Sequence, residues 1–146
     1  MGYEIVVYEE KLKEDVIEFY RNVLPESGRT LDLSGKHKVF QDIKNNYEEF
    51  WCLFDDNHLI GTVGINRMLN EKCCELKALY LYINFQGKGL GHMLLDEAVE
   101  YAKSKGYQKM YLDTLSTSKK AIHLYKSTGF KEIEGITIIR QPTYLW

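Results

Sequence analysis

The stretch ELKALYLYINFQGKGLGHMLL, residues 75–95, decides the fold of this chain, because a strand leads through a glycine-rich turn into a helix. Its glycines are Gly87, Gly89 and Gly91. The first N–H groups of a helix have no partner within the helix, and the helix dipole is positive there. Because glycine has no Cβ atom, an anionic group can approach this backbone closely. The stretch therefore predicts an anion-binding turn.

Two well-known phosphate-binding patterns do not fit this turn. A P-loop needs Ser or Thr after its lysine, whereas Lys88 is followed by Gly89. A dinucleotide-binding GxGxxG turn needs a different glycine spacing and an acidic residue at the end of a following strand. A third pattern, Q/RxxGxG/A after a long strand, is matched by Gln86, Gly89 and Gly91. These spacings disfavour a nucleotide-binding protein of the first two kinds.

The strand expected at Cys74–Ile83 has two interpretations. Read with a period of two, Leu76 falls on the face opposite Leu79 and Leu81. A β-bulge near Ala78–Tyr80 would bring these apolar side chains onto one face. A strand buried on both faces needs no bulge. The residues alone leave both interpretations open.

Apolar periodicity and turn residues predict the remaining elements in the order βααβββαβαββ. In the helix after the glycine turn, for example, Leu90, Leu94, Ala98 and Ala102 recur every four residues. No linker or repeat divides the chain, so we expect one domain over residues 1–146. The expected strands are Tyr3–Tyr8, Phe50–Phe54, Leu59–Asn66, Cys74–Ile83, Gln108–Thr114, Phe130–Ile139 and Thr143–Trp146; the expected helices are Lys13–Leu24, His37–Asn46, Gly89–Lys105 and Ser118–Thr128.

The composition excludes several classes of protein. With 146 residues, 45% hydrophobic and 27% charged, the chain is an ordinary globular one. Its net charge of −2 is mixed along the sequence, without a basic stripe for nucleic acid or a Lys/Arg cluster for a membrane surface. No apolar run approaches the roughly 18 residues of a membrane span, and no secretory signal is present. The spacing of cysteines and histidines predicts no metal site. We expect a cytoplasmic protein.

Two segments resemble the GNAT (Gcn5-related N-acetyltransferase) superfamily. The residues Glu75–Leu81 and Gln86–Leu95 look like its acetyl-CoA-binding motif. The residues Lys120–Phe130 are similar to its second motif, with a helix, a tyrosine and a Gly-Phe pair. Both lie in the expected order and spacing. The resemblance covers Phe50–Lys131, and the residues before it match only in the order of elements.

The resemblance implies an α/β (α+β) fold. Its central sheet would be mixed and mostly antiparallel, with about six to seven strands flanked by about four helices. Two parallel central strands of such proteins splay apart, and here these would be Cys74–Ile83 and Gln108–Thr114. The resemblance also favours the bulge in the first of them.

The resemblance implies acetyl-CoA as cosubstrate and no metal. The pantetheine arm would meet the backbone of Leu81, Tyr82 and Ile83, and an amide at or near Leu81 would stabilise the thioester oxyanion. Ser118 would contact the coenzyme, although capping of its helix explains the residue equally well. The pyrophosphate would meet the backbone amides of Gln86, Gly87, Lys88, Gly89, Leu90 and Gly91.

Two side chains are implied in catalysis. Tyr125 would protonate the coenzyme thiolate, because a phenol with a pKa near 10 keeps its proton at neutral pH. The alternative is an aromatic residue that only packs on the inner face of its helix. Glu75 would act as the base, directly or through water, and its alternative is a solvated strand residue.

The expected function is transfer of the acetyl group to a primary amine by direct attack, with a small molecule as acceptor. Two alternatives stay open: acetylation of a protein or peptide, and a non-catalytic acyl-CoA-binding module. A small excess of acidic residues over Glu9–Glu49 hints at a cationic amine. The apolar segment Thr143–Trp146 would offer a strand for a homodimer.

Overall fold

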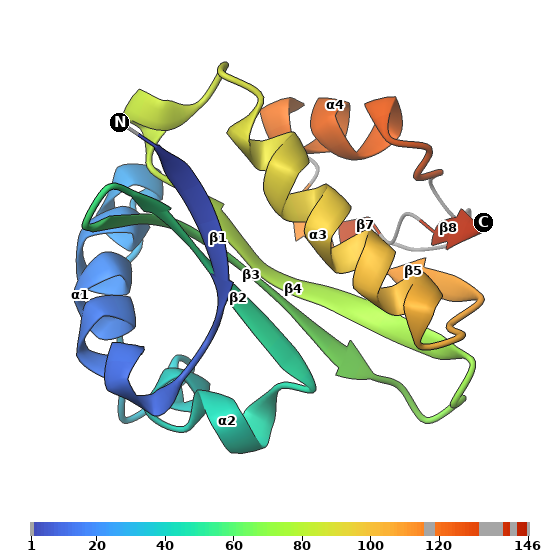
Figure 1. Ribbon diagram of the computed structural model, residues 1–146, viewed down its shortest axis with the longest axis horizontal. Helices are drawn as coiled ribbons and strands as arrows, with labels where there is room; N and C mark the ends of the chain where they lie inside the picture. Colours follow the sequence, from blue (N-terminus) through green and yellow to red (C-terminus); the bar gives the residue numbers. More distant parts are fainter. Residues whose placement is uncertain (1, 116–118, 132–138, 141–142, 146) are drawn as a thin grey trace.

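The centre of the molecule is a six-stranded sheet in the order β1-β2-β3-β4-β5-β8 (Figure 1). The computed structural model describes residues 2–115, 119–131, 139–140 and 143–145. Strands β4 and β5 run parallel, and the other neighbours in this sheet run antiparallel. The strands of this sheet are β1 (Tyr3–Val7), β2 (Glu49–Asp55), β3 (His58–Arg67), β4 (Cys73–Leu81), β5 (Lys109–Tyr111) and β8 (Thr143–Leu145). A second, two-stranded sheet pairs β6 (Thr114–Leu115) with β7 (Ile139–Arg140).

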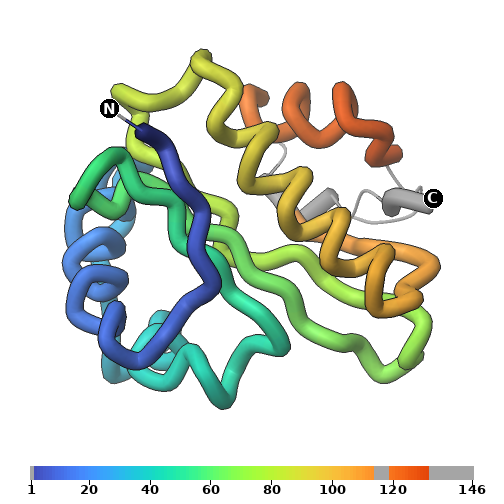
Figure 2. The backbone as a smooth tube through the Cα atoms, in the orientation of Figure 1, coloured from blue at the N-terminus to red at the C-terminus, as the bar shows by residue number. Residues whose placement is uncertain are grey.

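Helices cover both faces of the central sheet, which confirms the expected α/β class (Figure 1). The chain passes from β4 through the glycine turn into α3, which crosses one face of the sheet beside α4 (Figure 2). Helix α1 packs on the opposite face. Among the described residues, no helix has both the length and the apolar character needed to cross a bilayer. The helices are α1 (Lys13–Val23), α2 (Ile43–Asn46), α3 (Leu90–Ser104) and α4 (Lys119–Ser127), with short 3-10 turns η1 (Glu10–Leu12), η2 (Leu24–Ser27), η3 (Lys38–Gln41) and η4 (Ile83–Phe85).

The apolar stripe expected on the helix after the glycine turn is confirmed. Helix α3 buries this stripe against the sheet, and Gly106 follows its end with a φ of 87°. A left-handed residue at this place is a common way for a helix to end. The buried side chains of α3 are Leu90, Leu94, Leu95, Ala98, Val99 and Ala102.

The bulge in β4 is confirmed. Thr62 of β3 lies opposite Tyr80, but Gly64 lies opposite Lys77, so β4 holds one extra residue between these pairs. Ala78 lies in this interval and has a φ of 55°. After the bulge, Leu79 packs on the α3 face, the face that Leu76 occupies before it. The extra residue therefore keeps the apolar side chains of β4 on one side of the sheet.

Strands β4 and β5 separate after a short paired segment. The pairing covers only Cys73–Glu75 and Lys109–Tyr111. Strand β4 then continues to its bulge, whereas the chain after β5 enters the second sheet at Thr114. The central parallel strands therefore open into a cleft, as the resemblance implied.

Two expected elements differ in the structure, and a third lies mostly outside the described residues. The helix expected at His37–Asn46 is divided into η3 and the single turn α2, because Asp42 has a φ of −148° and interrupts it. Of the strand expected at Gln108–Thr114, the central sheet contains only β5, because Thr114, the last expected residue, belongs to the second sheet. Of the segment Phe130–Ile139, residues 132–138 lie outside the described residues.

Candidate active site

Two cavities open where β4 and β5 separate. Each has a volume of about 520 Å³, and they share a wall that includes Leu79, Tyr80, Leu81 and Tyr125. One extends along the glycine turn and α4, and we call it the turn cavity. The other extends toward the end of α1 and η2, and we call it the α1 cavity. Together they form one groove that passes the bulge of β4.

The glycine turn leaves its backbone open on the side of the turn cavity. Gly87 and Gly89 have φ values of 81° and 82°, and a Cβ atom on either would have no neighbour within 4 Å among the described residues. The N-cap residue of α3 is Gly89, which has no side chain to cap the helix, and the first helical hydrogen bond runs from Met93 N to Gly89 O. The amides of the first turn therefore remain available for an anion. This geometry fits a pyrophosphate.

Gly91 has a different role in the same turn. A Cβ atom at this position would lie 3.2 Å from Cδ2 of Leu124 in α4. The missing side chain therefore allows α4 to approach α3 closely, and Gly91 and Leu124 both line the turn cavity. The requirement for glycine here comes from helix packing as well as from ligand access.

Lysine and histidine side chains also line the turn cavity. Lys119 and Lys120 lie at the start of α4, and His92 and His123 complete this lining. The two lysines would neutralise the charge of a phosphate-bearing ligand. Sequence reasoning did not assign these four residues to the site. His92 directly follows Gly91 in the sequence, whereas only the packing of α4 beside the glycine turn brings Lys119, Lys120 and His123 to it. Ser118 lies outside the described residues.

Three of the backbone amides that were expected to meet the coenzyme, those of Tyr82, Ile83 and Gln86, are already hydrogen-bonded within the protein. The amide of Tyr82 donates to Ile60 O at 3.2 Å, and the amide of Gln86 donates to Ile83 O at 3.0 Å. The amide of Ile83 donates to a carboxylate oxygen of Glu26 at 2.9 Å. Because successive strand residues point their backbone groups to alternate sides, the amide of Leu81 faces the groove. Its carbonyl accepts Nε2 of the Gln86 side chain at 3.1 Å.

A buried relay of hydroxyl groups orients the bulge. The hydroxyl of Thr62 donates to the carbonyl oxygen of Ala78 at 2.8 Å. Since this uses its one hydrogen, Tyr20 must donate to Thr62 Oγ1, which lies 2.6 Å from the phenol oxygen. In a trans peptide the following N–H points away from the carbonyl. The amide of Leu79 is therefore directed away from β3 and toward the groove.

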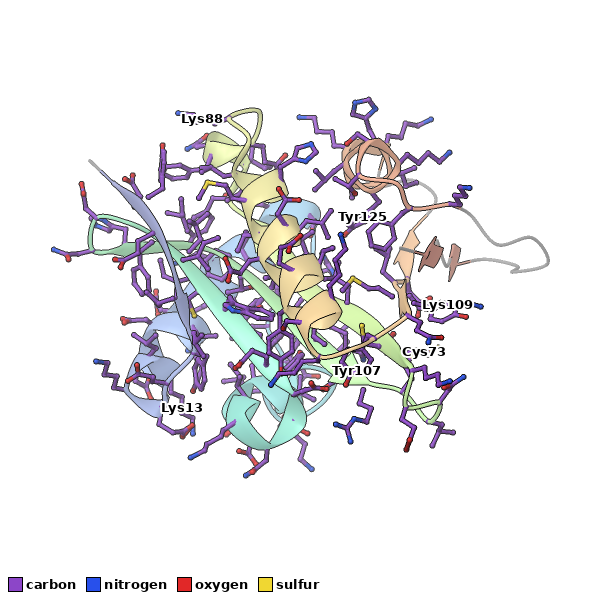
Figure 3. All side chains as sticks on the ribbon, turned by 45° about the vertical axis from the view of Figure 1, so that its right-hand side comes forward. Lys13, Cys73, Lys88, Tyr107, Lys109 and Tyr125 are labelled. Carbon is purple, nitrogen blue, oxygen red and sulfur yellow. The ribbon has the colours of Figure 1, made fainter. Side chains whose placement is uncertain are left out.

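Tyr125 lies on the wall that the two cavities share. It projects from α4 toward the sheet (Figure 3), and only 7% of its surface is exposed. Its ring packs against Phe130, with 5.8 Å between the ring centroids. Burial, with a further effect of Tyr80, raises the pKa of the phenol above its ordinary value. The hydroxyl therefore remains protonated at neutral pH and can donate a hydrogen bond.

Glu75 lies beside the α1 cavity rather than in its wall. Its Oε1 is 3.8 Å from Nζ of Lys77, which together with Asp113 lines this cavity. Burial raises the pKa of the Glu75 carboxyl, and Asp113 adds to this effect, whereas Lys77 opposes it. A carboxylate with a raised pKa is a stronger base than a fully solvated one.

Among the described residues, no group of histidine, cysteine and acidic side chains is arranged to hold a metal ion. The three cysteines are buried and free, and burial raises the pKa of the Cys52 and Cys74 thiols to about 12. Thiols of this kind are protonated and unreactive at neutral pH.

Known proteins share this architecture. An acetyltransferase of the GNAT family from Staphylococcus aureus has a TM-score of 0.87 and 22% identity, with 99% of each chain covered. The paiA N-acetyltransferase of Thermoplasma acidophilum, solved in complex with coenzyme A, has a TM-score of 0.83 and 22% identity, with 100% of each chain covered. Because the sequence identity is 22% in both cases, these similarities show the fold of the chain alone.

Curated proteins of similar sequence and a matching family pattern identify the family of this chain. An uncharacterized N-acetyltransferase of Schizosaccharomyces pombe is 41% identical over 75 residues, which are 51% of this chain and 46% of that protein. The chain spans between 29% and 66% of the length of three curated relatives that it matches. The sequence pattern described as "Acetyltransferase (GNAT) family" matches residues 10–130. This chain therefore belongs to the GNAT family of acetyltransferases.

Proposed function

We propose that this chain binds acetyl-CoA in the groove and transfers its acetyl group to the primary amine of a small molecule by direct attack. One observation carries the proposal. At the opening between β4 and β5, the groove brings together the glycine turn, the Leu79 amide and Tyr125. The coenzyme A complex of the Thermoplasma relative supports the choice of ligand.

The residues of the turn cavity would hold the coenzyme. The open amides of Gly87, Lys88, Gly89, Leu90 and Gly91 would bind the pyrophosphate, with the nearby Lys119 and Lys120 neutralising its charge. The backbone of Leu81 faces the groove and would pair with the pantetheine arm. When bound, acetyl-CoA supplies the activated acetyl thioester.

Two groups near the bulge would stabilise the charge that develops during transfer. The Leu79 amide would donate to the carbonyl oxygen as it becomes negative, and it is already oriented by the Ala78 carbonyl. The buried hydroxyl of Tyr125 would donate to the departing sulfur. Its raised pKa keeps the phenol protonated, so that it would donate a hydrogen bond to the sulfur as negative charge develops there.

The attacking amine must be neutral, so a base is required. Glu75 would accept its proton, directly or through water, because its pKa is raised by burial and by Asp113. The carboxyl lies next to the α1 cavity, which we take as the acceptor site. A cavity of about 520 Å³ suits a small molecule.

The assembly of the protein remains a prediction. Strand β8 pairs with β5 on one side and lies at the edge of the central sheet. A strand of a second copy of the chain would pair with β8 at this edge, as we expected from the sequence of Thr143–Trp146.

Titration calorimetry with acetyl-CoA, ATP and NADH tests the ligand. We expect acetyl-CoA to bind at micromolar concentration, and the two nucleotides to bind far more weakly. Release of the coenzyme thiol in the presence of amines then tests the reaction. Equal binding of ATP would contradict the proposed ligand, whereas coenzyme binding without thiol release from any amine would favour a non-catalytic acyl-CoA-binding module.

A further inference from the structure

Arg29 lies in the α1 cavity and is held there by neutral groups. Its Nε donates to Ser27 Oγ at 3.0 Å, and its Nη1 donates to the Tyr80 hydroxyl at 3.3 Å. The guanidinium carbon lies 5.5 Å from the centroid of the Tyr80 ring. Within the described part of the chain, no carboxylate pairs with this guanidinium.

The guanidinium keeps donors for a ligand. Arginine has a planar fork of N–H groups, and the two hydrogen bonds of Arg29 use only part of it. Its backbone is fixed as well, because the Arg29 amide donates to Leu24 O at 3.0 Å. A positioned fork of this kind matches the two oxygens of a carboxylate.

The same cavity also has an acidic side. Asp113 lines it, and among the described residues no cation forms an ion pair with this carboxylate. Glu75 lies close enough for Asp113 to raise its pKa. Glu26 also lines the cavity, but one of its oxygens accepts the Ile83 amide. The cavity therefore presents a guanidinium and separate carboxylates to one ligand.

Arg29 is not needed for the phosphates of the coenzyme. Those groups would meet the glycine turn and Lys119, which line the turn cavity, whereas Arg29 lines only the α1 cavity. Of the lysines that line the α1 cavity, Lys120 also lines the turn cavity, and Lys77 already has Glu75 as its partner at 3.8 Å. A second anionic group is therefore expected from the acceptor.

We propose that the acetyl acceptor is an amine that also carries a carboxylate, as an amino acid does. Arg29 binds the carboxylate, and Asp113 together with Glu75 receives the ammonium end before it loses its proton. This inference rests on the proposed acetyltransferase function. It also revises the weaker expectation of a purely cationic amine that the acidic composition of the first helices suggested.

The test compares amino acids with the amines that their decarboxylation would give. Three pairs sample different side chains: alanine and ethylamine, phenylalanine and 2-phenylethylamine, and lysine and cadaverine. Thiol release gives kcat/KM for each compound, and calorimetry gives the affinity for acetyl-CoA. For at least one pair we expect the amino acid to be preferred about tenfold to a hundredfold, as charged hydrogen bonds allow.

The variant Arg29→Gln should reduce this preference to near unity, mainly by raising KM for the amino acid. Arg29→Lys should restore part of it, because the charge returns without the planar fork. The control Arg21→Gln changes an exposed arginine that pairs with Glu18 on α1, and it should keep the preference of the unaltered protein.

The outcomes separate the two proposals. A protein that binds acetyl-CoA and acetylates both members of every pair equally well overturns this inference and leaves the proposed function standing. A preference for amino acids that persists in Arg29→Gln also overturns this inference. The same holds if a peptide with a free N-terminus and an amidated C-terminus is acetylated better than the amino acids. A protein that fails to bind acetyl-CoA overturns both proposals.

Discussion

The hydroxyl of Thr62 donates to the carbonyl oxygen of Ala78 at 2.8 Å, and this bond ties β3 to the bulge of β4. Both the hydroxyl and the Tyr20 phenol that donates to it are fully buried. Ala78 has a φ of 55°, a backbone conformation that is unfavourable for a residue with a side chain. The relay from α1 therefore helps to hold a strained peptide whose other side presents the Leu79 amide to the groove.

Replacing Thr62 by valine tests this relay. The shape of the side chain is kept, but the Ala78 carbonyl and the Tyr20 hydroxyl lose a buried partner, which should cost about 1–3 kcal/mol of unfolding free energy. We also expect kcat to fall about tenfold, because the Leu79 amide is less well oriented. The affinity for acetyl-CoA should change little. Denaturant unfolding, steady-state kinetics and calorimetry measure these three effects.

The matched control is Thr62→Ser, which keeps the hydroxyl and should retain most of kcat. If Thr62→Val loses stability but keeps the kcat of the unaltered protein, the relay is structural only, and the orientation of the Leu79 amide does not limit the reaction.

Replacing Tyr125 by phenylalanine removes the proposed acid. We expect kcat to fall about a hundredfold, whereas the affinity for acetyl-CoA stays within a few fold. Because burial raises the pKa of this phenol, the unaltered protein should show no loss of activity from Tyr125 up to pH 10. An unchanged kcat in Tyr125→Phe would leave the residue with a packing role against Phe130.

The sequence predicted those parts of the fold that are determined by residues close together in the chain. The stripe of α3 is a local pattern, and it is confirmed because one helical face must be buried. The bulge in β4 was one of two open interpretations, and the resemblance favoured it correctly. The residues alone do not decide it, because a strand buried on both faces has the same pattern.

The helix expected at His37–Asn46 is wrong for a local reason that a weak apolar pattern does not reveal. The Asn46 side chain donates to Asp42 O at 2.7 Å, and the Gln41 side chain donates to Leu33 O at 2.7 Å. The helical pattern stops at Asp42, which has an extended φ of −148° and whose amide donates to Val39 O, three residues back. The segment therefore folds into two short turns.

The site was predicted less completely than the fold, because its groups come from distant segments. Thr62 reads as an ordinary strand residue, and its contact with Ala78 requires β3 and β4 to pair across the bulge. Arg29 lies in a loop-like segment of the sequence, where nothing indicates that it will reach Tyr80. The role of such residues follows only from tertiary packing.

The proposed base Glu75 should give the reaction an acidic limb. The residue accepts a proton only when ionised, so activity should fall as pH decreases through its pKa. Burial and Asp113 raise this pKa, so the limb should lie above the range of a solvated glutamate. In Glu75→Gln we expect a lower kcat and no such limb in a plot of kcat against pH. If the limb persists in this variant, another group is the base.

Replacing Gly89 by alanine tests the glycine turn, and Gly106→Ala is its matched control. The two glycines flank opposite ends of α3 with φ values of 82° and 87°, and in the part of the chain that the structure describes a Cβ atom at either would have no neighbour within 4 Å. Both variants should therefore lose about 1–2 kcal/mol of unfolding free energy, because alanine is strained in this conformation.

Only Gly89→Ala should also weaken the binding of acetyl-CoA, by about tenfold or more, because its methyl group would occupy space that the pyrophosphate needs. Calorimetry of both variants, at a temperature where both are folded, separates this effect from backbone strain. Equal affinities in Gly89→Ala and Gly106→Ala would show that the coenzyme does not approach the turn at Gly89. The anion site would then have to be sought at the lysines of α4, which line the same cavity.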